Sequence, residues 1–170
     1  LKARQMMPRG ETYIGLAPGA GNPVKIWPRH NFIDVANYQI AQGRVPVFLL
    51  GPQEESWLPE LRDAVPDAMF PLQARKVWGT PEITIEQTLA VGSLLSGAVC
   101  NDSGTGHMLA AIDCPLVSLF GPTSPEKLAP RVSKGIIVRA QDFGGKTMDA
   151  IPSFAVQKAT DRLILLQNPS

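Results

Sequence analysis

The stretch from Ala98 to Pro115 limits the fold of this chain more than any other part of the sequence. Residues 98–100 are small and apolar, as residues at the end of a buried parallel strand are. Gly104 and Gly106 follow, and glycine lets the backbone turn sharply and approach a ligand closely. An apolar helical run then continues until Pro115 stops it. The sequence therefore predicts a strand, a tight turn and the start of a helix in direct succession.

This turn has the chemistry of an anion site. A helix that begins there points its free N–H groups and the positive end of its dipole outward, which favours phosphate. Ser103 and Thr105 can donate hydroxyl hydrogen bonds to phosphate oxygens, whereas the Asp102 carboxylate must cap the helix, orient a donor or bind sugar hydroxyls. The alternative is an ordinary connection in which Asp102 or Ser103 is only an N-cap. The crowding of Asp, Ser, Thr, His and two Gly into this turn favours phosphate binding.

The rest of the chain alternates strand and helix signals. Strands are expected at 13–17, 45–50, 98–100, 116–120 and 136–138, with a short edge strand at 69–72. Helices are expected from Pro28 to Gly43, over 54–64, from a capping box at Thr84 and Gln87 to Leu95, from the turn at 102–107, and from Ser153 as N-cap onward. This alternation predicts an α/β fold, a doubly wound, Rossmann-like parallel sheet with helices on both faces. We expect a single domain over residues 1–170, with a leading segment at 1–12.

Four loops follow strands and should gather at one rim of this sheet. They are the Gly-rich loop 18–23, the Gly51-Pro52 loop, the turn 102–107 and the loop 121–125. Ligands of such sheets bind beyond the carboxyl ends of the strands. The convergence of these loops therefore predicts a ligand site at this rim.

Composition excludes several classes of protein. A net charge of +1 with 18% charged residues lacks the basic field that nucleic-acid binding needs. No apolar run approaches the ~20 residues of a membrane span. Cys100 and Cys114 lie in or beside apolar runs and are expected to be reduced core thiols of a cytosolic protein. His30 and His107 are too few and too far apart to suggest zinc, so no metal site is predicted.

Two common nucleotide-binding motifs are excluded as well. The GxG at 19–21 is followed by Asn22-Pro23, where a dinucleotide-binding fold starts its helix, and no GxxxxGK[ST] occurs. Lys25 can neutralise a diphosphate or be an ordinary solvated lysine. His107 can donate to a phosphate or a leaving oxygen, or bond a backbone carbonyl. Trp27 is expected to pack in the core and not to stack on a base.

Five blocks of the chain occur in the order and spacing of a known family. They are Pro18-Gly19, Lys25-Ile26-Trp27-Pro28, Leu50-Gly51, Asn101-Asp102-Ser103-Gly104-x-x-His107-Met108-x-Ala110-Ala111 and Leu119-Phe120-Gly121-Pro122-Thr123-x-Pro125. In this the chain resembles glycosyltransferase family 9, the ADP-heptose:lipopolysaccharide heptosyltransferases. The resemblance runs from about Tyr13 to the end and covers the C-terminal, donor-binding half of these two-domain enzymes. It implies one half of a GT-B architecture, with the acceptor bound by an N-terminal domain that this chain lacks.

The resemblance also implies which residues bind the donor. The implied donor- and phosphate-binding residues are Gly19, Ala20, Gly21, Lys25, Asp102, Ser103, Gly104, Thr105 and His107. Asp102 would bind sugar hydroxyls, Lys25 would lie near the phosphates, and His107 would lie beside them. Ala20 and Gly21 stand where the family often carries hydroxyl residues, which implies a weaker phosphate grip or a different donor. The catalytic base of the family, an aspartate, belongs to the N-terminal domain, so no catalytic residue is expected in this chain.

The main functional expectation is the donor-binding domain of an inverting glycosyltransferase of lipopolysaccharide core biosynthesis. Its substrate would be a nucleotide-diphosphate sugar, ADP-heptose by the resemblance, and the N-terminal domain would bring a lipopolysaccharide-type acceptor. Such a transfer needs a base and stabilisation of the departing diphosphate, and this chain supplies the second. No resident cofactor is expected, although Mg²⁺ beside the diphosphate stays open. The expected location is the cytoplasm, with the inner face of the cytoplasmic membrane as an option.

Two alternatives stay open. One is a nucleotide-sugar epimerase-like enzyme, for which Glu54, Glu55 and Glu82 are the nearby carboxylates at the rim. The other is a non-catalytic nucleotide- or partner-binding module.

The chain starts at Leu1 without an initiator Met, which suggests a processed protein or a fragment that is inactive alone.

Overall fold

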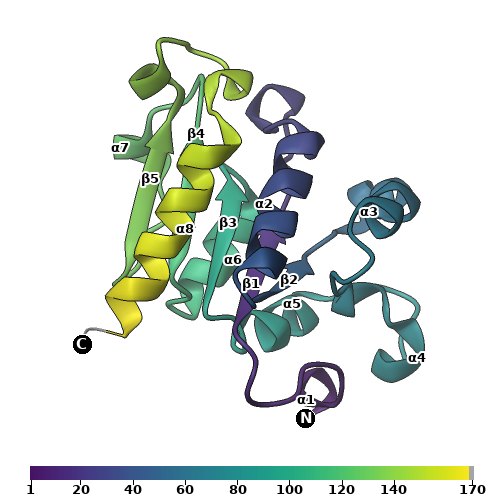
Figure 1. Cartoon of the computed structure of the whole chain (residues 1–170). Helices are drawn as coiled ribbons and strands as arrows, with labels where there is room; N and C mark the ends of the chain where they lie inside the picture. Colours follow the sequence, from purple (N-terminus) through teal and green to yellow (C-terminus); the bar gives the residue numbers. More distant parts are fainter. Residues whose placement is uncertain (169–170) are drawn as a thin grey trace.

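The computed structural model describes residues 1–168 and contains a parallel sheet with helices on both faces (Figure 1). Its strands are β1 (Tyr13–Ala17), β2 (Val45–Phe48), β3 (Gly97–Asn101), β4 (Leu116–Phe120) and β5 (Gly135–Arg139). They lie in the order β2-β1-β3-β4-β5, and every neighbouring pair is parallel. The α/β, doubly wound fold expected from the sequence is therefore confirmed.

The inner strands are buried over their whole length, as near-continuous apolar strands between two helical layers should be. Side chains alternate between the layers, so that Ile14 and Leu16 enter one core and Tyr13 and Ala17 enter the other. Gly97 opens β3 where α8 (Ser153–Gln167) crosses the sheet. A Cβ atom there would lie 2.8 Å from Leu163 Cδ2, so glycine allows the helix to approach closely.

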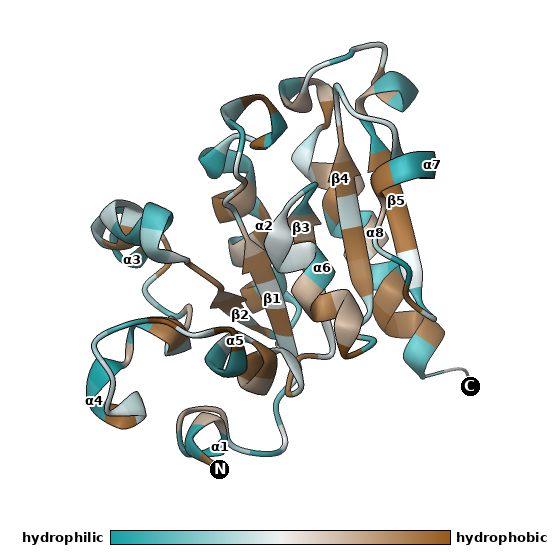
Figure 2. Ribbon diagram, turned by 180° about the vertical axis from the view of Figure 1, so that it is seen from behind, coloured by the Kyte–Doolittle hydropathy of each residue, from teal (hydrophilic) through white to brown (hydrophobic). Residues whose placement is uncertain are grey.

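Two groups of helices cover the sheet (Figures 1 and 2). α2 (Arg29–Ala41) and α8 pack on one face, where an ion pair of 2.7 Å joins Arg44 Nη1 to Asp161 Oδ1. α5 (Ile85–Gly92) and α6 (Gly104–Ala111) lie on the other face, with α1 (Lys2–Met6) from the leading segment beside α5. Figure 2 shows apolar residues concentrated along the strands and the helix faces turned toward them.

The chain makes a long excursion between β2, at one edge of the sheet, and β3 in its centre. The elements of this excursion are η2 (Pro52–Trp57), α3 (Leu58–Ala64), η3 (Pro71–Gln73), α4 (Arg75–Trp78) and α5. Side chains of this segment pack in both cores, but its only β-bridge to a strand within the described residues is an isolated one between Met69 and Val47. The expected edge strand at 69–72 was therefore wrong, because Pro71 offers no N–H to a ladder and starts a 3-10 turn instead.

Other boundaries also differ from the sequence-based expectation, and the helix expected to reach Leu95 ends at Gly92. The strand expected at 45–50 ends at Phe48, and the helix expected over 54–64 divides into η2 and α3, with Pro59 in the first turn of α3. Ser153 is not an N-cap, because Pro152 takes the extended N-cap conformation and Ser153 is already helical. The capping box at Thr84 is confirmed, with Thr84 Oγ1 accepting from the Gln87 amide at 3.2 Å.

The remaining elements are short and lie at or near the rim and the far edge. They are η1 (Pro23–Lys25), α7 (Pro125–Leu128), η4 (Ala140–Phe143) and η5 (Met148–Ala150). Cys100 and Cys114 are buried free thiols, and burial raises the pKa of Cys114 to about 12. Among the helices formed by residues 1–168, none has the length and apolar character required to span a bilayer.

Candidate functional site

The loops that follow β1 and β3 lie at the point where the strand order reverses. From β1 the chain runs outward to β2, and it then returns to β3 on the opposite side of β1. Ala17 and Cys100 are register partners at the carboxyl ends of these two strands, so the loop 18–23 and the turn 102–107 start side by side. In sheets of this order the crevice at such a switch point is where ligands bind.

Asn101 joins the segments around this crevice. Its side chain is 2% exposed, and its Nδ2 donates to the carbonyl oxygens of Pro18 at 3.0 Å and Gly19 at 3.3 Å. Its Oδ1 accepts from the Trp27 amide at 3.2 Å. One buried amide therefore fixes the first loop and the segment that carries Lys25. The Trp27 ring is buried against Phe32, which confirms its packing role.

The N-terminus of α6 is open to an anion. Ser103 is its N-cap, and Ser103 Oγ accepts from the Gly106 amide at a long 3.4 Å. The amides of Gly104 and Thr105 have no acceptor within the described residues, and Gly104 is exposed. Ser103 is therefore an N-cap, as the alternative interpretation held, yet two amides and the positive end of the helix dipole remain available.

Asp102 and Lys25 form a partly buried ion pair. Lys25 Nζ lies 3.1 Å from Asp102 Oδ2, with the lysine side chain 28% exposed and the carboxylate 7% exposed. Thr123 Oγ1 donates to the same oxygen at 2.9 Å. Asp102 therefore orients donors and is not the helix cap. Lys25 is no ordinary solvated lysine, and its removal would leave a buried carboxylate without its counter-ion.

Glu54, from η2, packs its side chain against Gly19 in the loop that follows β1. A Cβ atom on Gly19 would lie 1.4 Å from Glu54 Oε1, so only glycine leaves room for this carboxylate. The side chain is half-buried, and burial raises the pKa of Glu54 above its ordinary value. The sequence offered Glu54 only as a nearby carboxylate, since nothing local indicates that it packs on the loop after β1.

A groove of about 360 Å³ lies between these segments. Its lining residues are Gly19, Ala20, Gly21, Gly51, Pro52, Gln53, Glu54, Ser103, Gly104, Thr105 and Met108. Six of the predicted site residues are thus brought together here. Lys25 forms an ion pair with Asp102, the residue that precedes Ser103 in the chain. Neither Lys25 nor Asp102 lines the groove. His107 is exposed on the first turn of α6 and is also outside it.

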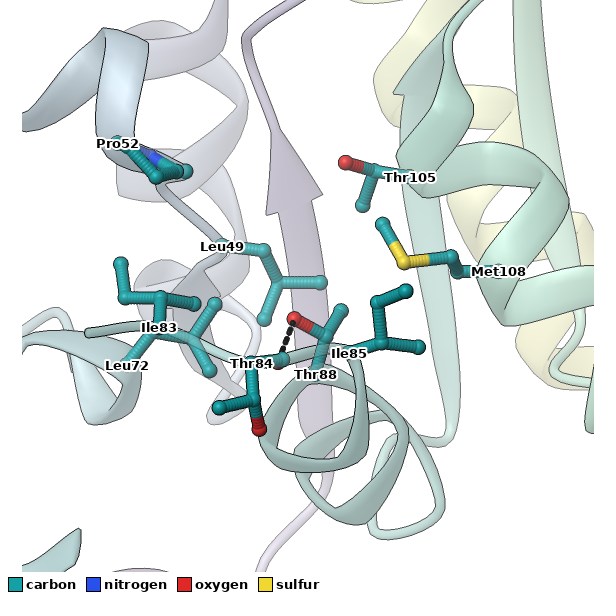
Figure 3. Close-up of a pocket in the computed structure, with 10 residues that line it drawn as sticks. Leu49, Pro52, Leu72, Ile83, Thr84, Ile85, Thr88, Thr105 and Met108 are labelled. Carbon is teal, nitrogen blue, oxygen red and sulfur yellow. Dashed lines mark hydrogen bonds between the residues drawn. The ribbon is translucent and has the colours of Figure 1, made fainter. Parts of the chain in front are cut away.

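An apolar pocket of about 170 Å³ continues this groove (Figure 3). The two share Gly51, Pro52, Thr105 and Met108. The other lining residues are Leu49, Leu72, Ile83, Thr84, Ile85 and Thr88, all of them from the excursion between β2 and β3. Sequence reasoning did not find this pocket. Met108 alone carried a signal, because it lies four residues after Gly104 and so on the same side of α6.

The carboxylates proposed for epimerase chemistry do not converge. Glu55 pairs with Arg75, and both line a separate depression with Glu82, whereas Glu54 lies in the groove. Among residues 1–168, no three His, Cys, Asp or Glu side chains come together as a metal site would require.

Comparison with known proteins gives consistent results. The sequence model of glycosyltransferase family 9 (heptosyltransferase) matches residues 1–153. Lipooligosaccharide heptosyltransferase 2 of Haemophilus influenzae is 31% identical over 127 residues, which is 74% of this chain and 36% of that protein. Lipopolysaccharide heptosyltransferase 2 of Escherichia coli is 32% identical over 130 residues, which is again 74% of this chain and 36% of that protein. The matched residues of this chain therefore span about a third of the length of these relatives.

Solved structures share the fold. The E. coli ADP-heptose lipopolysaccharide heptosyltransferase II superposes with a TM-score of 0.78 at 24% identity, covering 98% of this chain and 51% of that one. An E. coli heptosyltransferase with ADP superposes with a TM-score of 0.76 at 19% identity, covering 95% of this chain and 48% of that one. A UDP-GlcNAc 2-epimerase of Methanocaldococcus jannaschii superposes with a TM-score of 0.53 at 14% identity, covering 95% of this chain and 41% of that one. The chain corresponds to about half of each heptosyltransferase structure.

Proposed function

This chain belongs to glycosyltransferase family 9, the heptosyltransferases, and on that basis we propose that it is the part of the enzyme that binds the nucleotide-diphosphate sugar. The relatives are named for the lipopolysaccharide or lipooligosaccharide heptosyltransferase reaction, and the fold is shared with a heptosyltransferase described with ADP. We take ADP-heptose as the donor. The acceptor and the catalytic base belong to a second domain that lies outside this chain.

The diphosphate binds at the start of α6. Gly104 and Thr105, whose amides are free within the described residues, line the groove at the positive end of the helix dipole. The Ser103 hydroxyl keeps its proton for donation, because its oxygen acts as the acceptor of the helix cap. The Lys25 ammonium, held by Asp102, adds positive charge beside this end.

The nucleoside occupies the rest of the groove. The apolar pocket suits the faces of a nucleobase, since its wall is built mainly from aliphatic side chains and Met108. Glu54 lines the groove and not the apolar pocket, and its carboxylate can accept hydrogen bonds from ribose hydroxyls. The order base, ribose, diphosphate along the groove then leads the sugar toward Asp102. Within residues 1–168 Asp102 Oδ1 accepts no hydrogen bond, so it is available to a sugar hydroxyl.

In this mechanism the chain stabilises the leaving group. The acceptor hydroxyl attacks the anomeric carbon of the sugar and passes its proton to the base of the other domain. The bond from the anomeric carbon to the phosphate oxygen breaks, and the nucleoside diphosphate departs with that electron pair. The α6 amides and Lys25 stabilise the charge that develops on the diphosphate. An acceptor of lipopolysaccharide type would reach the sugar from the second domain, at the inner face of the cytoplasmic membrane.

The observation that carries this proposal is the pair of free amides at the start of α6, in a groove that continues into an apolar pocket. Gly104→Pro tests it directly. Proline is tolerated at the first position of a helix, and Ser103 has the extended backbone (φ −152°, ψ 164°) that suits the residue before proline. This variant removes one N–H from the phosphate site without ending the helix.

The matched control is Gly104→Ala, because a Cβ atom at this position meets nothing within 4 Å and the N–H is retained. By titration calorimetry we expect ADP to bind the wild-type chain in preference to UDP and GDP. The proline variant should bind ADP more weakly by about 10-fold or more, the effect of one charge-assisted hydrogen bond. The alanine variant should bind within about 2-fold of the wild type. Equal ADP affinity in all three proteins would show that phosphate does not bind at this helix.

A further inference from the structure

We propose that Thr88 makes the base pocket selective for a nucleobase with an exocyclic amine, such as adenine, over one with a carbonyl at the same position. This inference rests on the proposed function, because it takes the apolar pocket to be the site of the base. It assigns a specificity-determining role to a residue of α5 that belongs to none of the sequence blocks described above.

The pocket offers few polar atoms with which to read a base. Most of its wall is aliphatic, and an apolar wall by itself discriminates weakly between bases of similar size. Three threonines contribute hydroxyls. Thr105 lies at the mouth that the pocket shares with the phosphate groove. The Thr84 hydroxyl is engaged in capping α5 and points away from the pocket in Figure 3. Thr88 is the remaining hydroxyl among the lining residues, and its oxygen lies within the wall (Figure 3).

The Thr88 hydroxyl is committed as a donor. The side chain is 5% exposed, and its Oγ1 donates to the Thr84 carbonyl oxygen at 3.3 Å, one turn earlier in the helix. A hydroxyl has a single proton, so what remains toward the pocket is lone-pair density on the oxygen. Thr88 therefore presents an acceptor, which pairs with an N–H group and not with a carbonyl oxygen.

The difference between the two kinds of base follows from burial. An amine at the base edge can donate to Thr88 Oγ1, and Thr88 itself is only 5% exposed to water. A carbonyl in the same place would set two acceptors against each other, or would require the hydroxyl to rotate and give up its bond to Thr84. Either outcome weakens binding by roughly one hydrogen bond, which corresponds to about 10-fold in affinity.

ADP and IDP test this inference, because the two nucleotides differ only at one edge of the purine. Adenine carries an amine at position 6 and an acceptor at N1, whereas hypoxanthine carries a carbonyl at position 6 and a proton on N1. Their affinities would be measured by calorimetry for the wild-type chain, Thr88→Val and Thr88→Ser. We expect the wild type to prefer ADP over IDP by about 10-fold. Thr88→Val, which replaces the hydroxyl with a methyl group of similar size, should lose this preference. Thr88→Ser, which keeps the hydroxyl, should retain it even if the missing methyl group lowers both affinities.

The chain offers a matched control in Thr160, on α8. Thr160 is 1% exposed, and its Oγ1 donates to the Val156 carbonyl oxygen at 2.8 Å, the same bond to the preceding turn that Thr88 makes. Its helix, α8, covers the opposite face of the sheet from α5 (Figure 1). Thr160→Val removes an equivalent buried bond and should leave the ADP-to-IDP ratio unchanged.

An unchanged ratio in Thr88→Val, or a wild-type chain with no preference between ADP and IDP, would overturn the role of Thr88 while leaving nucleotide binding intact. A wild-type chain that binds none of ADP, IDP and UDP would overturn the proposed function and this inference together. A lost preference in Thr160→Val would also refute the inference, because the effect would then follow from any buried threonine.

Discussion

Removal of the Asn101 side chain should weaken both the fold and the nucleotide site. Asn101→Ala deletes the three buried hydrogen bonds to Pro18, Gly19 and Trp27. At about 1 kcal/mol each, the free energy of unfolding should fall by about 3 kcal/mol. For a domain of this size that corresponds to a decrease in Tm of roughly 6–12 °C. ADP affinity should fall as well, because the first loop and the segment that carries Lys25 lose their common anchor.

Urea unfolding followed by tryptophan fluorescence measures the stability, and calorimetry well below the Tm measures ADP binding. The control is Leu163→Ala, which empties a fully buried site under α8 at the amino end of β3, away from the rim. Its cavity should destabilise the chain by about 2–5 kcal/mol, comparable to the loss in Asn101→Ala, without changing ADP affinity. The reasoning would be refuted by an Asn101→Ala protein with wild-type ADP affinity, or by equal losses of affinity in both variants.

Two further predictions concern Glu54 and the loop on which it packs. Because burial raises the pKa of Glu54, the folded state pays for its ionisation, and wild-type stability should fall as pH rises from the ordinary carboxyl pKa through the raised value. Glu54→Gln should therefore be more stable than the wild type at neutral pH but not at low pH, while it binds ADP more weakly; a stability difference independent of pH in urea titrations would contradict this. Gly19→Ala should displace the Glu54 carboxylate and weaken ADP binding measured by calorimetry, whereas Gly21→Ala should not, because a Cβ atom at Gly21 meets nothing within 4 Å. Equal affinities of these two alanine variants would argue against a role for the Gly19–Glu54 contact.

The fold could be predicted because its signals are local. The inner strands are short, continuous apolar runs, and the breakers around them mark the loops at the rim. The N-cap of α5 was recognisable from Thr84 and Gln87 alone. Ser153 failed as an N-cap because the extended backbone of Pro152 let the helix begin one residue after the proline, a choice that the serine itself does not determine.

The sequence predicted only those parts of the candidate site whose residues all come from a single segment. The turn at 103–105 carries its own chemistry, and the structure places it in the groove with the loop at 19–21. The pairing of Lys25 with Asp102 and the packing of Glu54 on Gly19 depend on loops from different strands, so no local pattern encodes them. The apolar pocket was missed for a related reason. Its aliphatic residues are indistinguishable in sequence from core residues, and only the path of the excursion leaves them lining an opening.

The excursion between β2 and β3 is one part of the candidate site, and the tips of β1 and β3 are the other. These two parts could evolve at different rates. The phosphate end of the groove depends on the tips of β1 and β3, which are locked into the centre of the sheet. The proposed base pocket is built mostly from the excursion, whose only β-bridge to the sheet within the described residues is the one between Met69 and Val47. On the proposed function, substitutions in the excursion would change which nucleotide is bound and would leave the proposed diphosphate site unchanged.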